Sequence, residues 1–127
     1  MDGSQTGSTH AAGRLVVICG CMFAGKTTRL IELLRTAAAA GRRVLAVKHA
    51  DDTRYDPARL ATHEGRSFAA RPLRDAREIL TLAAGCDVVG VDEAHFFGRG
   101  LTAVCDELVR LGRDVVVVGL EHDAWGR

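Results

Sequence analysis

The chain has 127 residues, of which 47% are hydrophobic and 26% are charged, and its formal net charge is +1. This length allows one domain with its own hydrophobic core, and the near-neutral charge excludes a general attraction to nucleic acid or to an anionic membrane. No apolar run is long enough to cross a bilayer, and the N-terminus lacks the basic and apolar regions of a signal peptide. We therefore expect a cytoplasmic protein.

Residues 1–13 are rich in Gly, Ser, Thr and Ala, and we expect them to form a tail that buries too little to become ordered. Residues 14–127 are expected to form a single domain without internal repeats. The four cysteines lie in or beside apolar stretches and form no C-x-x-C pair: Cys19, Cys21, Cys86 and Cys105. We therefore expect buried free thiols in a reducing compartment and no zinc in this chain.

A strand predicted over 14–19 leads into a glycine-rich turn and then into a helix predicted over 27–40, which Gly41 is expected to end. From Gly20 the turn fits G-x-x-x-x-G-K-[ST], the pattern of a phosphate-binding P-loop. Its glycines leave room for backbone N–H groups to surround a phosphate, and the start of the helix adds a positive dipole. The predicted phosphate-binding residues are Gly20, Phe23, Ala24, Gly25, Lys26, Thr27 and Thr28.

Strands and helices are expected to alternate along the rest of the chain. Further strands are predicted over 44–47, 67–70, 86–91 and 115–120, and further helices over 73–84 and 100–111. The polar stretch after the strand at 44–47 is expected to form a long loop, which in a compact domain is usually functional or disordered. This alternation predicts an α/β fold of the P-loop NTPase, RecA-like kind, with a parallel sheet covered by helices on both faces.

The apolar run at 88–91 ends in Asp92 and Glu93. At this place in a P-loop protein an acidic residue holds Mg²⁺, so Asp92 and the Thr27 hydroxyl are the predicted metal ligands. Glu93 can activate a nucleophile, either water or a substrate hydroxyl, although a simple cap at the strand end would also explain the two carboxylates. The combination predicts nucleotide-dependent phosphoryl transfer or hydrolysis, with Arg54 or Arg66 as a candidate charge-neutralising arginine unless each is a solvated surface charge.

Four segments in order resemble the thymidine kinases of the type found in vertebrate cytosol and many bacteria. Residues 20–28 are similar to that family's G-P-M-F-S-G-K-[ST]-[ST], and residues 48–55 to its K-x-x-x-D-T-R-Y. Thr-His-Glu-Gly at 62–65 is similar to its [ST]-H-[DE]-G, and residues 89–97 are similar to its I-G-I-D-E-[GA]-Q-F-F. The resemblance covers roughly residues 13–120.

The resemblance implies ATP- and Mg²⁺-dependent phosphorylation of thymidine to dTMP, a step of nucleotide salvage for DNA synthesis. It implies that Glu93 takes the proton from the thymidine 5′-hydroxyl and that Asp52 and Arg54 lie near the phosphates. Residues implied to line the nucleoside pocket are Met22, Phe96 and Leu120, whereas Phe96 taken alone also suits core packing. The family forms tetramers, which implies a homo-oligomer.

The sequence departs from the family pattern at several places. Cys21 replaces the usual proline, His95 replaces the usual glutamine, and residues 120–125 differ from the family's L-D-x-[TD]-F. The family's C-terminal region carries a zinc ribbon and a lasso-like loop that grips the thymine. Residues 1–127 contain no match to either, so we expect this chain to be C-terminally shortened. A degenerate ATP-binding module without kinase turnover is therefore an alternative.

The string Asp-Glu-Ala-His at 92–95 is also the DEAH box of a helicase class. A DEAH-type ATPase is disfavoured because such a motor needs two lobes and a Ser-Ala-Thr motif, and because the charge offers no nucleic-acid footprint. A GTPase is disfavoured because no N-K-x-D motif is present.

Overall fold

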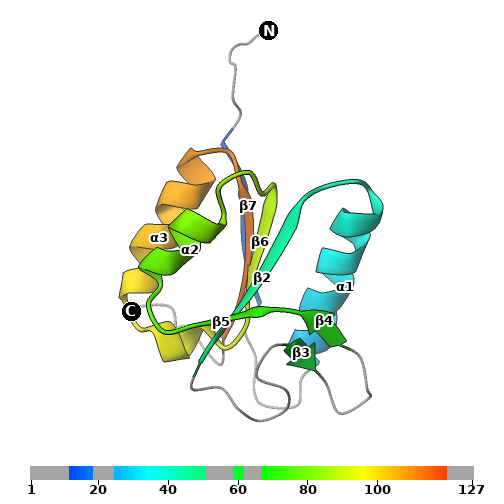
Figure 1. Ribbon diagram of the computed structural model, residues 1–127, viewed down its shortest axis with the longest axis horizontal. Coiled ribbons are helices and arrows are strands. Elements are labelled where there is room, and N and C mark those ends of the chain that lie inside the picture. The colour runs from blue at the N-terminus through cyan, green and yellow to red at the C-terminus, as the bar shows by residue number, and fades with distance from the viewer. Residues whose placement is uncertain (1–11, 19–24, 51–58, 62–66, 120–127) are drawn as a thin grey trace, which may run out of the picture.

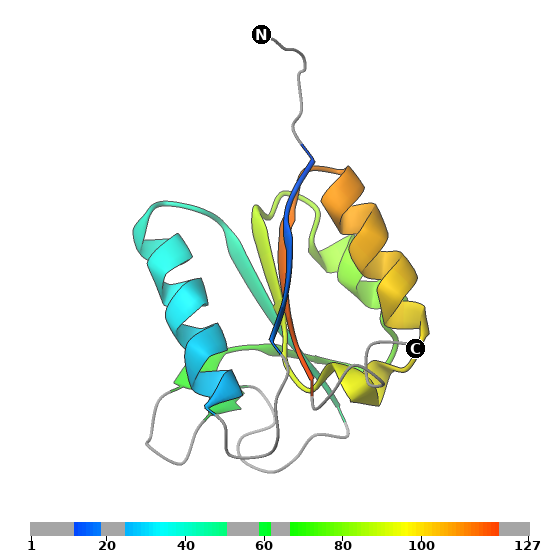
Figure 2. The same cartoon turned by 180° about the vertical axis from the view of Figure 1, so that it is seen from behind.

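A computed structural model describes residues 12–18, 25–50, 59–61 and 67–119. In this part of the chain five parallel strands form one sheet, in the spatial order β1-β7-β6-β2-β5. The strands are β1 (Leu15–Ile18), β2 (Val44–His49), β5 (Arg71–Leu73), β6 (Val88–Val91) and β7 (Asp114–Val118). Helix α1 (Lys26–Ala39) covers one face, and α2 (Arg77–Leu82) and α3 (Gly100–Arg110) cover the other (Figure 1, Figure 2). The predicted α/β architecture is thus confirmed.

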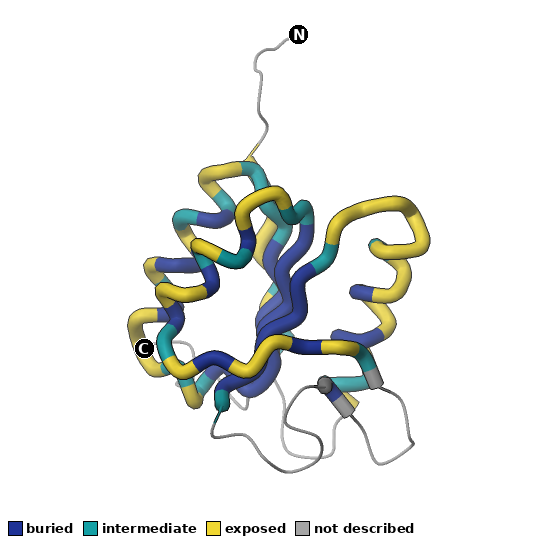
Figure 3. The backbone as a smooth tube through the Cα atoms, viewed as in Figure 1, coloured by how far each residue is buried: buried dark blue, intermediate teal, exposed yellow. Residues whose placement is uncertain are grey.

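The central strands are apolar on both sides because helices cover both faces of the sheet. All four residues of β6 are buried, as are the last four of β7. In Figure 3 the buried residues run through the middle strands, while the exposed ones lie on the outer surfaces of the helices. Since parallel strands all point the same way, the carboxyl ends of β1, β6 and β2 lie at one edge of the sheet.

Two hydrophobic layers hold the helices to the sheet. On the α1 side the helix contributes the fully buried side chains of Leu30, Ile31 and Leu34. They pack beside Gly90 of β6, where a Cβ atom would lie 2.9 Å from Leu34 Cδ1 and 3.0 Å from Leu30 Cδ1. A glycine is therefore needed in the strand so that α1, which begins at the phosphate-loop motif, can approach it closely.

At the opposite edge of the sheet, where the strands begin, the carboxylate of Asp114 connects the start of β7 to the segments that precede β1 and β2. Asp114 Oδ1 accepts the Arg14 backbone N–H at 2.9 Å, and Asp114 Oδ2 lies 2.9 Å from Arg42 Nη2. Burial opposes ionisation of this carboxyl, but the Arg14 hydrogen bond and the Arg42 guanidinium outweigh it and lower its pKa. Just before β1, the Gly13 N–H donates to Val109 O of α3 at 2.8 Å. Residues 1–11 of the predicted tail lie outside the described residues.

The helix predicted over 73–84 is wrong in its first part. Leu73 is the last residue of β5, where it pairs with His49 of β2, and α2 begins only at Arg77. Leu73, Ala76 and Ile79 are all buried, so the apolar spacing correctly marked core residues. Spacing alone does not separate a short strand followed by a helix from one longer helix.

The region predicted as a long loop contains more strand than expected. β2 continues through Lys48 and His49, since these residues pair with Pro72 and Leu73 of β5. A second, antiparallel sheet joins β3 (Arg59–Ala61) to β4 (Ser67–Ala69), and the second of these strands confirms the one predicted at 67–70. β3 is not predicted from the sequence, because its three residues show no readable alternation.

No helix of the described part has the length and apolarity needed to cross a membrane.

The two described cysteines differ in burial, which predicts different reactivity. Cys105 is fully buried in α3, and burial raises the pKa of its thiol to about 12, whereas Cys86 is only partly buried. Because the thiolate is the reacting form, we expect Cys105 in the native protein to be alkylated by iodoacetamide far more slowly than Cys86 at pH 8. Peptide mass spectrometry after timed labelling measures both sites, and equal rates would contradict this packing.

Candidate active site

The first turn of α1 opens the site at the carboxyl edge of the sheet. Gly25 precedes the helix with φ 76°, a left-handed conformation that suits glycine, and accepts the Arg29 N–H at 3.0 Å. Lys26 is the first helical residue and is 8% exposed. The positive end of the helix dipole and its first backbone N–H groups therefore face the region where β1 ends, which is an arrangement that favours an anion.

Thr27 reaches from this helix to the end of β6. Its hydroxyl Oγ1 donates toward the Asp92 carboxylate and lies 3.3 Å from both Oδ1 and Oδ2. Asp92 is 3% exposed, and its backbone N–H donates to Val47 O of β2 at 3.0 Å. Two residues 65 positions apart thus meet, because β6 ends and α1 begins at the same edge of the sheet.

These two side chains fit a magnesium ion. Mg²⁺ takes oxygen ligands and is usually held by one or two carboxylates together with substrate phosphates, rather than by a cage made wholly of protein. A hydroxyl and a carboxylate that already converge supply such a pair. In the ranges that the structure describes, no group of three or more His, Cys, Asp or Glu side chains gathers as a candidate metal cluster.

Glu93 has an unusual backbone conformation. Its φ of 49° and ψ of 55° are left-handed, and it is the one described non-glycine residue with a positive φ. Its N–H donates to Asp92 Oδ1 at 3.0 Å and its carbonyl accepts the Phe96 N–H at 3.1 Å. Backbone strain of this kind persists where the surroundings enforce it and is frequent at active sites, so it supports a functional role for Glu93.

A short 3-10 helix, η1 (Ala94–Phe97), follows Glu93 and carries an aromatic cluster. The Phe96 ring stacks on His95, with centroids 4.7 Å apart, and on His49 of β2, with centroids 5.8 Å apart. Phe97 meets His49 edge-on at 4.9 Å and packs against the core, whereas Phe96 remains 40% exposed. Core packing therefore explains Phe97 but not Phe96, which stays partly exposed close to Glu93 in the chain.

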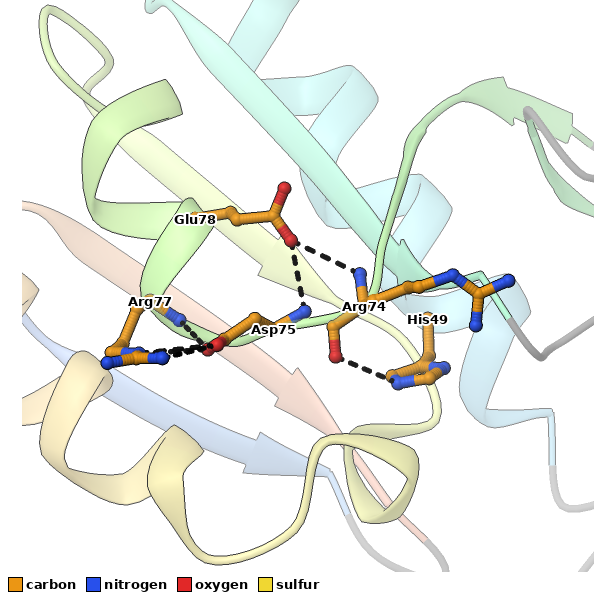
Figure 4. Close-up of polar contacts among 5 residues, drawn as sticks. All are labelled: His49, Arg74, Asp75, Arg77 and Glu78. Carbon is orange, nitrogen blue, oxygen red and sulfur yellow. Dashed lines mark hydrogen bonds and ion pairs between the residues drawn. The ribbon is translucent and has the colours of Figure 1, made fainter.

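Besides its ring contacts with Phe96 and Phe97, the His49 side chain has a polar contact with the backbone of another segment. Its Nε2 lies 3.2 Å from Arg74 O, in the turn between β5 and α2 (Figure 4). In that turn Glu78 accepts the N–H groups of Arg74 and Asp75, at 3.4 and 3.1 Å. Side-chain and backbone hydrogen bonds from Arg77 lower the pKa of the Asp75 carboxyl to about 2. The turn is therefore well fixed, and with it the imidazole that lies against Phe96.

The structure brings together only part of the predicted site. Lys26, Thr27, Asp92 and Glu93 meet at one edge of the sheet, and Phe96 follows in η1. Other predicted residues lie outside the described residues and stay predictions: Gly20, Met22, Phe23, Ala24, Asp52, Arg54, Arg66 and Leu120.

Sequence reasoning missed two buried polar residues at the end of β2, Lys48 and His49, which are 3% and 7% exposed. Both lie in the segment 48–55 that resembles one of the family motifs and is expected to be a loop, but neither is among the predicted site residues. A signal was available, since a lysine and a histidine directly after the apolar run Val44–Val47 mark the carboxyl end of a buried strand.

Comparisons with known proteins agree on one family. The sequence pattern of the family "Thymidine kinase" matches residues 13–126. A thymidine kinase of Coprothermobacter proteolyticus is 46% identical over 114 residues, which are 90% of this chain and 58% of that protein. Thymidine kinases of Bacteroides fragilis and Halobacterium salinarum are 42% and 46% identical, over 93% and 91% of this chain and 59% and 61% of their own lengths. The chain thus spans about three fifths of these relatives.

Proposed function

This chain belongs to the thymidine kinase family, and we propose on that premise that it transfers the γ-phosphoryl group of ATP to the 5′-hydroxyl of thymidine, giving dTMP and ADP. The observation that supports the proposal most strongly is the 3.3 Å approach of the Thr27 hydroxyl to the Asp92 carboxylate, next to the strained Glu93. It joins the start of the phosphate-loop helix to the two acidic residues in one place.

In the phosphate half of the site, backbone N–H groups around Gly25 and at the start of α1 bind the phosphates. The residues assigned to this cradle are Gly20, Phe23, Ala24, Gly25, Lys26, Thr27 and Thr28, with Asp52 and Arg54 nearby. Lys26 reaches the β- and γ-phosphates, and Thr27 and Asp92 hold Mg²⁺. When bound, this ion neutralises charge on the phosphate oxygens.

In the nucleoside half, Glu93 accepts the proton of the thymidine 5′-hydroxyl while that oxygen forms its bond to the γ-phosphorus. The bond between the γ-phosphorus and the bridging oxygen breaks, and ADP leaves with that oxygen. Phe96 offers its exposed ring to the nucleoside, and Met22 and Leu120 complete the pocket. The product is a deoxynucleotide for DNA synthesis, and the reaction is one of nucleotide salvage.

The remaining expectations concern the whole protein. A cytoplasmic location, a homo-oligomer and the lack of nucleic-acid, membrane and zinc partners stay predictions. The two described cysteines are free thiols, and Cys19 and Cys21 lie outside the described residues.

The test measures ADP release by this chain with Mg²⁺-ATP, with and without thymidine, and identifies dTMP by chromatography. We expect ADP release that depends on thymidine and matches dTMP formation mole for mole. Single-stranded DNA is added in a parallel reaction as a control. Stimulation by DNA in place of thymidine would favour the DEAH-type ATPase. ATP binding without turnover would leave a nucleotide-binding module and contradict the kinase proposal.

A further inference from the structure

His95 contacts the carboxylate of Glu93 from the first turn after it. His95 Nε2 lies 3.4 Å from Glu93 Oε1, and the two side chains are 28% and 9% exposed. The imidazole is fixed by its stacking on Phe96, with an interplanar angle of 29°. The backbone is fixed as well, because the His95 carbonyl accepts the Gly98 N–H at 3.3 Å. His95 Nε2 is therefore held near the carboxylate by the stacking of the ring on Phe96 and by this backbone hydrogen bond.

The surroundings of the other ring nitrogen indicate which tautomer of the neutral ring is favoured. His95 Nδ1 is buried, and among the residues that the structure describes it has no hydrogen-bond partner. A proton on Nδ1 would be a buried donor without an acceptor, which is costly, whereas a bare Nδ1 leaves only an acceptor unused. The arrangement therefore favours the neutral tautomer that carries its proton on Nε2, the atom facing Glu93.

We propose that His95 is a positioning residue, which holds the Glu93 carboxylate in its reactive orientation by donating its Nε2–H to Oε1. This inference rests on the proposed function of Glu93 as the base. The opposite oxygen, Oε2, is then the one turned to the thymidine 5′-hydroxyl. The 3.4 Å separation of Nε2 and Oε1 is longer than a formed hydrogen bond, and we expect it to shorten when substrate fills the site, as catalytic hydrogen bonds commonly do.

The need for such a partner follows from the side chain of Glu93. A glutamate has several rotatable bonds, so each contact to its carboxylate helps to set where the reactive oxygen lies. A base that is displaced by about 1 Å can lose about 100-fold in rate, because the reacting atoms no longer line up. A donor at a fixed place removes this freedom while leaving the carboxylate able to accept a proton.

Two variants that differ by one methylene group separate positioning from packing. Both His95→Gln and His95→Asn remove the ring that stacks on Phe96. The longer glutamine amide nitrogen reaches the place of the imidazole Nε2, while the asparagine amide stops near the place of Nδ1. The measurements are kcat, the KM values for thymidine and ATP, and the melting temperature of each variant.

We expect His95→Asn to lower kcat by about 10- to 100-fold with KM values close to those of the unchanged chain, because the interaction acts on the transition state. His95→Gln should recover most of that loss, and both variants should melt at similar temperatures. Equal kcat values for the two variants would overturn the positioning role, whether both are active or both inactive. An unchanged chain without thymidine-dependent turnover would overturn the proposed function and this inference with it.

A second readout does not depend on activity. Nitrogen chemical shifts of the His95 ring at neutral pH report which nitrogen carries the proton. We expect the proton on Nε2. A ring with its proton on Nδ1 has no donor to offer to Glu93, and this result would overturn the positioning role even if Glu93 itself proved to be the base.

Discussion

We expect Glu93→Gln to lower kcat for thymidine-dependent ADP formation by about 100- to 10,000-fold, the usual contribution of a general base. Glutamine has nearly the same size, and the backbone contacts of residue 93 to Asp92 and Phe96 do not involve the side chain. An amide cannot take up the proton of the 5′-hydroxyl. Binding of Mg²⁺-ATP should change little, because Thr27 and Asp92 are untouched.

The matched control is Glu107→Gln, the same change on α3. Glu107 is bound by the Arg110 side chain, which lowers its pKa, and surface pairs of this kind are worth little. This variant should keep the kcat of the unchanged chain. If Glu93→Gln kept more than about a tenth of the activity, Glu93 would fall short of what a general base contributes and would not be the base.

Leu34→Ala is the change with the largest expected effect on folding. Leu34 is completely buried between α1 and the sheet, and truncating such a leucine costs about 2–5 kcal/mol because it leaves a cavity. Urea unfolding followed by circular dichroism measures the change in free energy. Leu33→Ala, at the neighbouring position that is 37% exposed, is the control and should cost much less.

Gly90→Ala tests the same contact from the strand. Its new Cβ atom would lie 2.9 Å from Leu34 Cδ1, so alone it should cost about 1–3 kcal/mol as an overpacked core. In the Leu34→Ala background it should cost less, because the two Leu34 methyls are gone and the added carbon enters the cavity, while Leu30 Cδ1 at 3.0 Å remains. Additive costs would contradict the close approach of α1 to β6.

The order of the main strands and helices could be predicted because their apolar patterns are long and regular. The buried run of β6 and the helical spacing of α3 are examples, and both have nearly the predicted bounds. β3 and β5 have three residues each, too few to show a period. β3 exists as a strand because it pairs with β4, and β5 because it pairs with β2. The local sequence of each short strand does not reveal these pairings.

The candidate site also has features that could be predicted from the sequence and features that could not. The meeting of Thr27 with Asp92 followed from topology, since a helix that begins after one parallel strand lies at the carboxyl end of the others. The left-handed conformation of Glu93 and the contacts of His49 and His95 did not. They depend on side-chain directions within a few Å, which neither composition nor spacing contains.

That Thr27 and Asp92 act on one magnesium ion is the claim on which the mechanism depends most. The measurement is a double-mutant cycle of Thr27→Val and Asp92→Asn, with the affinity for ATP determined by calorimetry at one magnesium concentration for all variants, and again without magnesium for the unchanged chain. Each single change should weaken binding, and the double variant should bind little worse than the weaker single one, with a coupling of at least about 1 kcal/mol. Losses that simply add, or affinities that do not respond to magnesium in the unchanged chain, would contradict a shared ion at this edge of the sheet.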